Sequence, residues 1–409
     1  MRNINTKHLL HMQKNNRGAA LALMVILMLL LSISSLTAIQ IGRDARLRSV
    51  KNNDDIAARY AADAGAERAV YIMNKTLAAG EWNTGAVPAF SSEPLSGANA
   101  VYSVTTTGSP AAGYQITSIG HAGGATRTVR IHAKLSNPFA LNYAVFSENT
   151  VNLKSHSSVR GFDSSDRWRR NLTADIGTMS NNHGSIDIKN GAEVFGDVYV
   201  GPTGDPSKVV SMKHRSDIKG ELFNQPLPPP LPPVSAPTYL SNKGKLIGKD
   251  ITLSAKDSGA YSSISIANNG QLRITGHCVL AVSGDIELKN DAEVYITDSG
   301  SLTLYLAGDF DAKNSSGVVN TSAVPSKFKL YGTGSKQTID LKTDHSFFGV
   351  IYAPNADMTL YNGGSAYGSF IVNNFEMKNS GHVYYDKALN NPTVIDEAAR
   401  FVIVRWEEL

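Results

Sequence analysis

The chain begins with a continuous run of apolar residues. From 19 to 41 no residue is charged, and the first part of this stretch reads AALALMVILMLLLSI. At 1.5 Å per residue the run is long enough to cross a hydrocarbon core of about 30 Å. The residues that follow are Ala-rich and contain no proline until Pro88. We therefore predict one helix over 19–79, with a membrane-spanning half that presents Leu21, Leu23, Val25, Ile26, Leu29, Leu30 and Ile33.

The pattern changes to strict alternation after a polar loop. Three segments, 101–105, 114–119 and 126–133, have apolar residues at every second position and are separated by glycine-containing turns. This period of two is typical of half-buried strands joined by short turns. We predict a small antiparallel sheet within residues 80–137.

A third pattern fills 138–225 and 241–390. Short apolar cores such as Ile264–Ile266, Leu272–Ile274 and Ile286–Leu288 begin seven or eight residues apart, with Gly, Asn, Asp or Ser between them. This spacing leaves no room for crossover helices, which excludes an α/β arrangement. Three cores make about 23 residues, close to one coil of a parallel β-helix. The predicted fold class is mainly β with one long amino-terminal helix; a β-sandwich is the alternative for the third pattern.

Two segments do not follow the β pattern. Residues 226–240 contain PLPPPLPPVSAP, which favours polyproline II and predicts a stiff spacer between two solenoid parts, with a docking motif as the alternative. Residues 391–409 are expected to form a cap of the solenoid or a tail.

Charge and cysteine content exclude several classes of protein. The net charge of +4 comes from the leader, since Arg2, Lys7, Lys14 and Arg17 precede the apolar run and the remaining 35 basic residues equal the 35 acidic ones. No nucleic-acid partner is therefore expected. The single cysteine, Cys278, cannot form an intramolecular disulfide or a cysteine-rich metal site, and its apolar context predicts a core position.

The amino terminus resembles that of a type IV prepilin. Asn16-Arg17-Gly18 is followed at once by Ala19 and the apolar run, and the segment 60–67 is similar to the Ala-rich segment of PilX-type minor pilins. The resemblance implies that a leader, 1–18, stays cytoplasmic and that prepilin peptidase cuts between Gly18 and Ala19. It further implies a single-pass inner-membrane protein with a periplasmic carboxyl-terminal part, which joins other pilins and reaches the pilus or cell surface.

Leu23 departs from the pattern of the major pilins. Most of them carry Glu at this fifth mature position, where it can pair with a neighbouring subunit inside the filament. Leu23 therefore favours a minor subunit acting in assembly priming or in adhesion at the tip. The segment 348–356 with 367–370 also resembles a domain found behind PilX-type amino termini in envelope proteins, whose role is unknown.

Catalytic and metal-binding motifs are not found. The sequence lacks His-Glu-x-x-His, a phosphate loop and a nucleophile elbow. Asp197, Asp285 and Asp309 each follow a glycine at a strand entry, where an acid can cap turn amides. We expect no catalytic residue, no metal, no cofactor and no enzymatic activity, and His156, His183 and His214 are too dispersed to argue as ligands. Two alternatives stay open: a membrane-anchored β-helix protein that binds or modifies polysaccharide, and an envelope scaffold unrelated to pili.

One cluster is a candidate surface for binding. Arg167, Trp168, Arg169 and Arg170 form the densest group of basic and aromatic residues outside the membrane region. Such a group can hold an anionic surface glycan or a lipid head group. The alternative is a solvated loop with a half-buried tryptophan.

Overall fold

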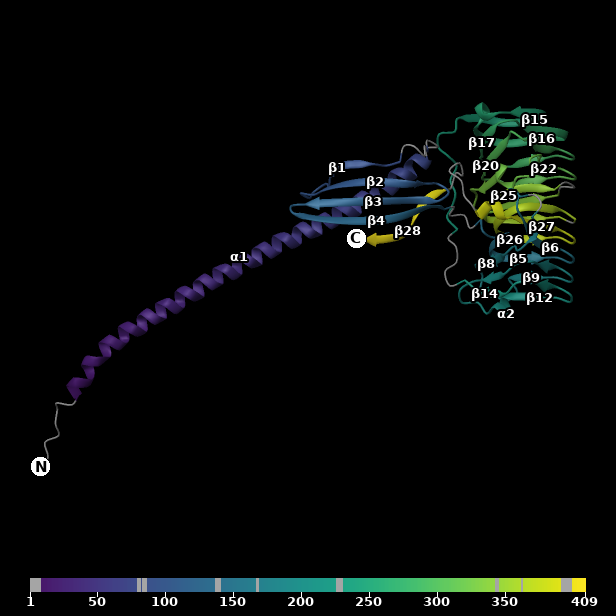
Figure 1. Cartoon of the computed structure of the whole chain (residues 1–409). Coiled ribbons are helices and arrows are strands. Elements are labelled where there is room, and N and C mark those ends of the chain that lie inside the picture. The colour runs from purple at the N-terminus through teal and green to yellow at the C-terminus, as the bar shows by residue number, and fades with distance from the viewer. Residues whose placement is uncertain are drawn as a thin grey trace. The chain divides into compact units, whose positions relative to one another are not determined.

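The computed structural model describes residues 9–78, 82, 87–136, 141–166, 169–225, 231–342, 346–361, 363–390 and 399–409, with side chains from residue 20 onward. The chain divides into two compact units (Figure 1), one of residues 1–134 with 401–409 and the other of residues 135–400. Apart from one long helix, regular structure in the described residues is mainly β, as the sequence predicts.

The long helix α1 runs from Leu9 to Ala78. It starts inside the segment expected as a leader. Its carboxyl-terminal half packs on the first sheet through small residues, and Ala58, Ala61 and Ala62 have no exposed surface. The approach is close, since a Cβ on Gly120 of the facing strand would lie 2.0 Å from the carbonyl oxygen of Ala58. The Ala-rich composition of 57–70 follows from this packing.

In the described residues the first sheet has five strands in the order β1-β2-β3-β4-β28. The predicted meander is confirmed, because β2 pairs antiparallel with β3, and β3 with β4. The strand bounds are β1 Phe90–Pro94, β2 Val101–Ser109, β3 Gly113–Ala122, β4 Ala125–Ser136 and β28 Arg400–Glu408.

The prediction that 391–409 caps the solenoid is wrong for the described residues from 399. Strand β28 joins the first sheet beside β4. Phe401 is 2% exposed, and its ring centroid lies 4.8 Å from that of Trp82 and 5.4 Å from that of Tyr114. Burial of this ring in the first unit gives the chain end its position; residues 391–398 lie outside the described residues.

The second unit is a parallel β-helix. Ile264 of one strand pairs with Ile286 and Ile286 pairs with Phe310, so equivalent positions recur about every 22–24 residues. Parallel pairing excludes the β-sandwich alternative. The strands of the first segment are β5 Val145–Leu153, β6 Ser158–Phe162, β7 Arg170–Leu172, β8 Ile176–Thr178, β9 Ile186–Ile188, β10 Glu193–Val194, β11 Val198–Val200, β12 Val210–Met212, β13 Asp217–Ile218 and β14 Leu222–Asn224, with the short helix α2 at Pro206–Val209.

The second segment supplies longer strands to the same solenoid. They are β15 Asn242–Leu253, β16 Gly259–Ile274, β17 His277–Val282, β18 Ile286–Leu288, β19 Glu293–Ile296, β20 Ser301–Leu306, β21 Phe310–Ala312, β22 Gly317–Asn320, β23 Phe328–Gly332, β24 Gln337–Leu341, β25 Phe347–Leu360, β26 Ser365–Met377 and β27 His382–Asp386. Short 3-10 helices lie at Ala255–Asp257, Pro325–Lys327 and Lys387–Asn390.

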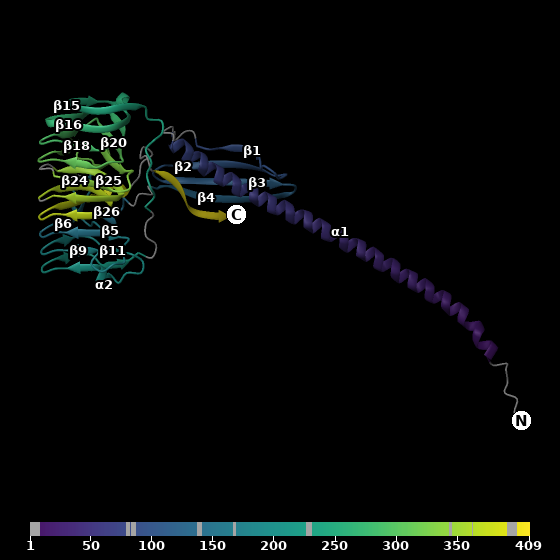
Figure 2. The same cartoon turned by 180° about the vertical axis from the view of Figure 1, so that it is seen from behind.

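The two segments form one continuous stack. Strand β26 pairs with β5, and β27 pairs with β6, so the last coil of the second segment lies on the first coil of the first segment. The chain therefore enters the solenoid in its middle, winds to the β14 end, and resumes at the β15 end (Figures 1 and 2). Sequence spacing alone did not predict this order.

The described part of the Pro-rich segment lies on the solenoid. The hydroxyl of Tyr352 donates to the carbonyl oxygen of Pro232 at 2.9 Å, and Leu231, Val234 and Ala236 pack on a cluster that contains Tyr305 and Tyr331. The described residues of the segment, from 231 onward, thus form a strap over an aromatic outer face of the solenoid.

One turn repeats in register from coil to coil. Asn269, Asp291 and Ser315 occupy equivalent positions, and all three have φ between 53° and 55°. Ser380, His156, Gly191 and Arg215 form the same left-handed column in the other coils. Six of these seven turns have a lysine two residues earlier, and three of these lysines pair with an acid on the strand just before the turn: Lys189 with Asp187, Lys313 with Asp311 and Lys378 with Glu376. A short motif thus closes each coil.

Candidate functional site

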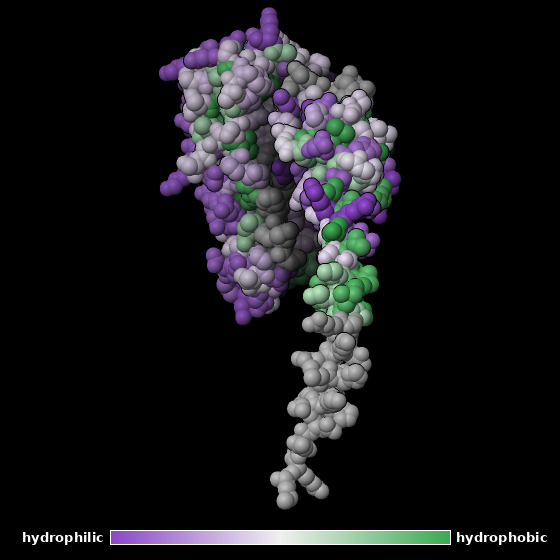
Figure 3. All heavy atoms as spheres, turned by 90° about the vertical axis from the view of Figure 1, so that its left-hand side faces the viewer, coloured by the Kyte–Doolittle hydropathy of each residue, from purple (hydrophilic) through white to green (hydrophobic). Residues whose placement is uncertain are grey.

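The exposed half of α1 is the first candidate site. The helix is long and apolar enough to cross a membrane, and its most apolar window is not buried at all. Leu21 is 71% exposed and Leu23 is 69% exposed, and Val25, Ile26, Leu29, Leu30 and Ile33 are also exposed. Figure 3 shows these hydrophobic residues gathered along the helix. Gly18 and Ala19 lie within α1, so the predicted cleavage point is helical in the uncut chain.

A column of aromatic rings lies on the outside of the second unit. Phe348, Tyr367 and Tyr384 occupy equivalent positions on β25, β26 and β27. Ring centroids lie 4.4 Å apart for the first pair and 4.5 Å for the second, with interplanar angles of 17° and 13°. All three side chains are partly exposed. These residues are named the ring column below.

Two further groups extend the ring column. Phe162 meets Tyr367 edge to face, at 5.3 Å between centroids and 90° between planes. Arg160 is paired in register with Tyr384, and its guanidinium lies 4.1 Å from the ring centroid of Phe195 while binding Glu193 at 3.1 Å. Flat side chains therefore continue across the seam where the second segment meets the first.

The β6–β7 hairpin brings one residue of the predicted basic cluster to the ring column. Phe162 on β6 pairs with Arg170 on β7. Arg170, Asn171, Ser164, Phe348, Tyr367 and Tyr384, among others, line a cavity of about 440 Å³. Its size falls within the usual range for small-ligand sites. Arg167 and Trp168 lie outside the described residues.

The described residues of the loop before Arg170 are held by hydrogen bonds within the loop and by one to Asp386. The Asp163 carboxylate accepts from the Ser165 amide at 3.0 Å, and the Asp163 amide donates to the Arg169 carbonyl at 3.2 Å. The Asp386 carboxylate accepts from the Ser164 amide at 2.9 Å. The Arg169 side chain is highly exposed, and its guanidinium lies 4.0 Å from the Asp163 carboxylate. Arg169 is not among the residues that line the cavity.

The electrostatics of the cavity favour an anion. Among the residues that the structure describes, no carboxylate lines the cavity and none pairs with Arg170. Burial, with a smaller contribution from Tyr384, raises the pKa of Tyr367, while Arg170 and the Ser346 hydroxyl act in the opposite direction. The Tyr367 hydroxyl is therefore a neutral donor at physiological pH.

The three acids at glycine-preceded strand entries have structural roles. Asp197 accepts from the Glu221 amide at 2.9 Å, Asp285 from the Asp309 amide at 2.9 Å, and Asp309 from the Thr338 amide at 2.7 Å. The glycines are needed for space: a Cβ on Gly308 would lie 2.3 Å from Oδ1 of Asp285. Each carboxylate thus caps the next coil, as the sequence predicts.

The remaining sequence candidates do not form a metal or nucleophile site. Within the described ranges no group of three His, Cys, Asp or Glu side chains could hold a metal ion. Burial raises the pKa of Cys278 to about 11, which suits a core thiol and not a nucleophile. His156 belongs to the left-handed turn column, two coils from the turn of His214, with the turn of Gly191 between them.

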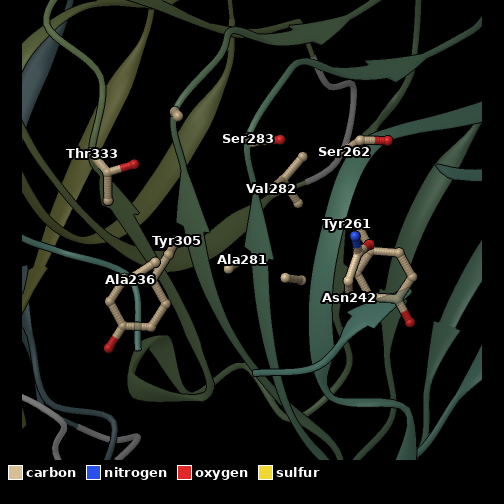
Figure 4. Close-up of a pocket in the computed structure, with 11 residues that line it drawn as sticks. Ala236, Asn242, Tyr261, Ser262, Ala281, Val282, Ser283, Tyr305 and Thr333 are labelled. Atoms are coloured by element: carbon tan, nitrogen blue, oxygen red, sulfur yellow. The ribbon is translucent and has the colours of Figure 1, made fainter. Parts of the chain in front are cut away.

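Two other cavities are less informative. One of about 330 Å³ (Figure 4) lies between the strap and the solenoid, where Tyr305 of β20 stands beside Ala236, and its lining is apolar with neutral hydroxyl and amide groups. Another of about 510 Å³ is polar and contains Asp309 and Asp357. Both acids already accept hydrogen bonds, Asp309 from Thr338 and Asp357 from Asn373 and Asn374.

Comparisons with known proteins bear mainly on the second segment. The family described as a domain of unknown function (DUF7305) matches residues 238–392. The match covers β15 to β27, including the ring column. No curated protein matches. A solved structure, the competence-associated pilin ComZ of Thermus thermophilus, shares 14% identity, with 87% of this chain and 97% of that chain covered and a TM-score of 0.33.

Sequence reasoning missed the ring column itself. Its signal was present, because Phe348-Gly349 and Tyr367-Gly368 each begin a coil with an aromatic residue before glycine. Coil length in this region is shorter than 23 residues, so the rings come into register only when the strand pairing is known. Arg170, in contrast, belongs to the basic cluster that the sequence singles out as a candidate binding surface.

Proposed function

We propose that the chain is a pilin-like subunit of a type IV pilus or related pseudopilus. The observation that carries the proposal is the division of α1 into an exposed apolar half and a half that packs on a small antiparallel sheet. In a water-soluble protein the apolar face of a helix is buried in the core. The exposed apolar half of α1 must therefore be covered by lipid or by the helices of other subunits. This explains why one helix serves both as membrane anchor and as assembly element.

Within that proposal, the chain is a minor subunit that acts in assembly priming or in adhesion at the tip. Leu23 occupies the position where major pilins carry Glu, so it offers no charge to pair with a neighbouring subunit. The solenoid adds a large carboxyl-terminal unit, which suits a position where few subunits stack around it. Its partners are other pilins, and it resides in the inner membrane before it reaches the surface.

We propose further that the chain is not an enzyme. The acids at the strand entries are engaged by backbone amides of the next coil, and a glycosidase would need two carboxylates at a defined separation facing a substrate. Replacing Asp285 by Asn would then change stability alone. Turnover of a polysaccharide by the purified chain, lost in that variant while the fold persists, would favour the enzyme alternative.

Mass spectrometry of the native amino terminus tests the pilin-like proposal. The expected mature chain starts at Ala19 and lacks residues 1–18. Gly18→Leu should block the cut, because a side chain at that position would obstruct the protease cleft. Gly42→Leu is the matched control on the same helix, since a Cβ there meets no atom within 4 Å and processing should continue. A native chain that retains Met1 would contradict the proposal.

A further inference from the structure

We propose that the ring column and Arg170 form a binding site for an acidic polysaccharide. The inference goes beyond the pilin-like function, because it concerns a surface of the second unit alone and can be measured whether or not α1 assembles into a filament. It rests on the register of the aromatic rings, on Arg170, which pairs with no carboxylate among the described residues, and on the cavity that both line.

The arrangement presents hydrogen-bonding groups in a row. The rings of Phe348, Tyr367 and Tyr384 stack face to face, so their faces largely cover one another and their edges point outward. The edge of an aromatic ring carries the positive part of its quadrupole. Two phenol hydroxyls therefore stand one strand spacing apart, about 4.8 Å, beside positively polarised edges.

Arg170 gives the row a preference for anions. A guanidinium binds a carboxylate through two parallel N–H donors, and such charge-assisted bonds are among the strongest polar contacts in proteins. Asn171, with φ of 58°, and Ser164 add neutral polar groups to the same cavity. A sugar acid matches both kinds of group in the cavity: its carboxylate can bind Arg170, and its hydroxyls can hydrogen-bond to the tyrosines and Asn171.

The extent of the surface favours a polymer over a single small anion. The column spans three coils, and Arg160 and Phe195 continue it over two more. A free phosphate would use Arg170 alone and leave the hydroxyl row without a role. A polyuronate chain lying along the solenoid axis would contact several coils at once. Because these contacts belong to one ligand molecule, their combined affinity exceeds that of any single contact.

Calorimetric titration of the full chain in a nonionic detergent with polygalacturonate oligomers tests the proposal. Saturable binding that weakens with added salt is expected. Arg170→Gln should lower the affinity at least about tenfold, as loss of a charge-assisted bond implies. Arg169→Gln is the matched control: it removes an equal charge one residue away, outside the cavity, and should change the affinity less than about twofold.

Two further comparisons decide between a sugar site and simple charge attraction. Poly-L-glutamate carries carboxylates without sugar hydroxyls and should bind much more weakly than polygalacturonate, while neutral dextran should not bind. Replacing Tyr367 and Tyr384 together by Phe keeps the stacked rings but removes both hydroxyls, and should also weaken binding to polygalacturonate. Equal binding of poly-L-glutamate, displacement by millimolar inorganic phosphate, or an unchanged affinity in both Arg170→Gln and the double Phe variant would overturn the proposal.

Discussion

Asn74 and Phe401 exchange two hydrogen bonds although 327 residues separate them. The Asn74 side-chain Nδ2 donates to the Phe401 backbone carbonyl at 3.0 Å, and the Phe401 backbone amide donates to Asn74 Oδ1 at 2.7 Å. One side chain of α1 thus satisfies both backbone groups of a residue in β28. This pair ties the chain end to the first unit.

Asn74→Ala should release β28 from the helix. Loss of two partly buried hydrogen bonds costs about 1–3 kcal/mol, because the backbone groups of Phe401 are left without partners. Hydrogen exchange of the peptide 399–409 should accelerate strongly in the variant. Asn53→Ala on the exposed face of the same helix is the control and should leave this peptide protected. Unchanged protection in Asn74→Ala would show that other contacts hold the strand.

Gly120→Ala should disrupt the contact between α1 and the first sheet. The new Cβ would lie 2.0 Å from the Ala58 carbonyl oxygen and 2.6 Å from the Ala62 amide nitrogen, and neither backbone group can move without moving the helix. We expect a loss of about 3 kcal/mol or more in the free energy of unfolding of the first unit. Thermal unfolding in detergent measures it. Gly124→Ala, where a Cβ meets no atom within 4 Å, should unfold close to the wild-type temperature.

Asp285→Ala should weaken the solenoid at one coil. It removes the acceptor of the Asp309 amide at an exposed turn, where water can take over the hydrogen bond, so we expect a loss of about 0.5–1.5 kcal/mol. Urea denaturation followed by tyrosine fluorescence measures the loss. Asp291→Asn is the control in the same coil, since that residue has φ of 55° and Asn tolerates this conformation well. If both variants unfolded at the same urea concentration, the carboxylate would have no capping role.

The local elements of this fold could be predicted from the sequence, whereas the order of the coils could not. Alternation in 101–133 and the recurrence of Ile264, Ile286 and Phe310 are local signals, because each follows from which side of a strand faces the core. The pairing of Phe370 with Val145 has no such signal. This pairing depends on the path that the strap takes along the solenoid, and that path is set by the packing of all the coils together.

The site was predictable only in part for the same reason. Arg170 belongs to a basic cluster that is visible in the sequence. Its neighbours in the cavity, Phe348 and Tyr384, lie 178 and 214 residues further along the chain. The expectation of a cap or tail at 391–409 failed for the described residues from 399, because Phe401 buries its ring beside Trp82 and Tyr114 in the first unit. In both cases a long-range contact overrode the local pattern.

His382 should make the solenoid less stable in mild acid. Burial, together with the charge of Arg160, lowers the pKa of His382, and its Nδ1 lies 2.9 Å from the Ser158 hydroxyl oxygen. The folded state therefore favours the neutral ring, and the unfolded chain takes up a proton near pH 6.5. The stabilisation is present above that pH and is lost as the pH falls from about 6.5 toward the lowered pKa of the folded state. The urea midpoint should therefore drop between pH 7.5 and pH 5.5, and His382→Gln should reduce this drop while lowering the midpoint at pH 7.5. His121→Gln in the first unit serves as the control, and a drop of full size in His382→Gln would assign the acid sensitivity to other groups.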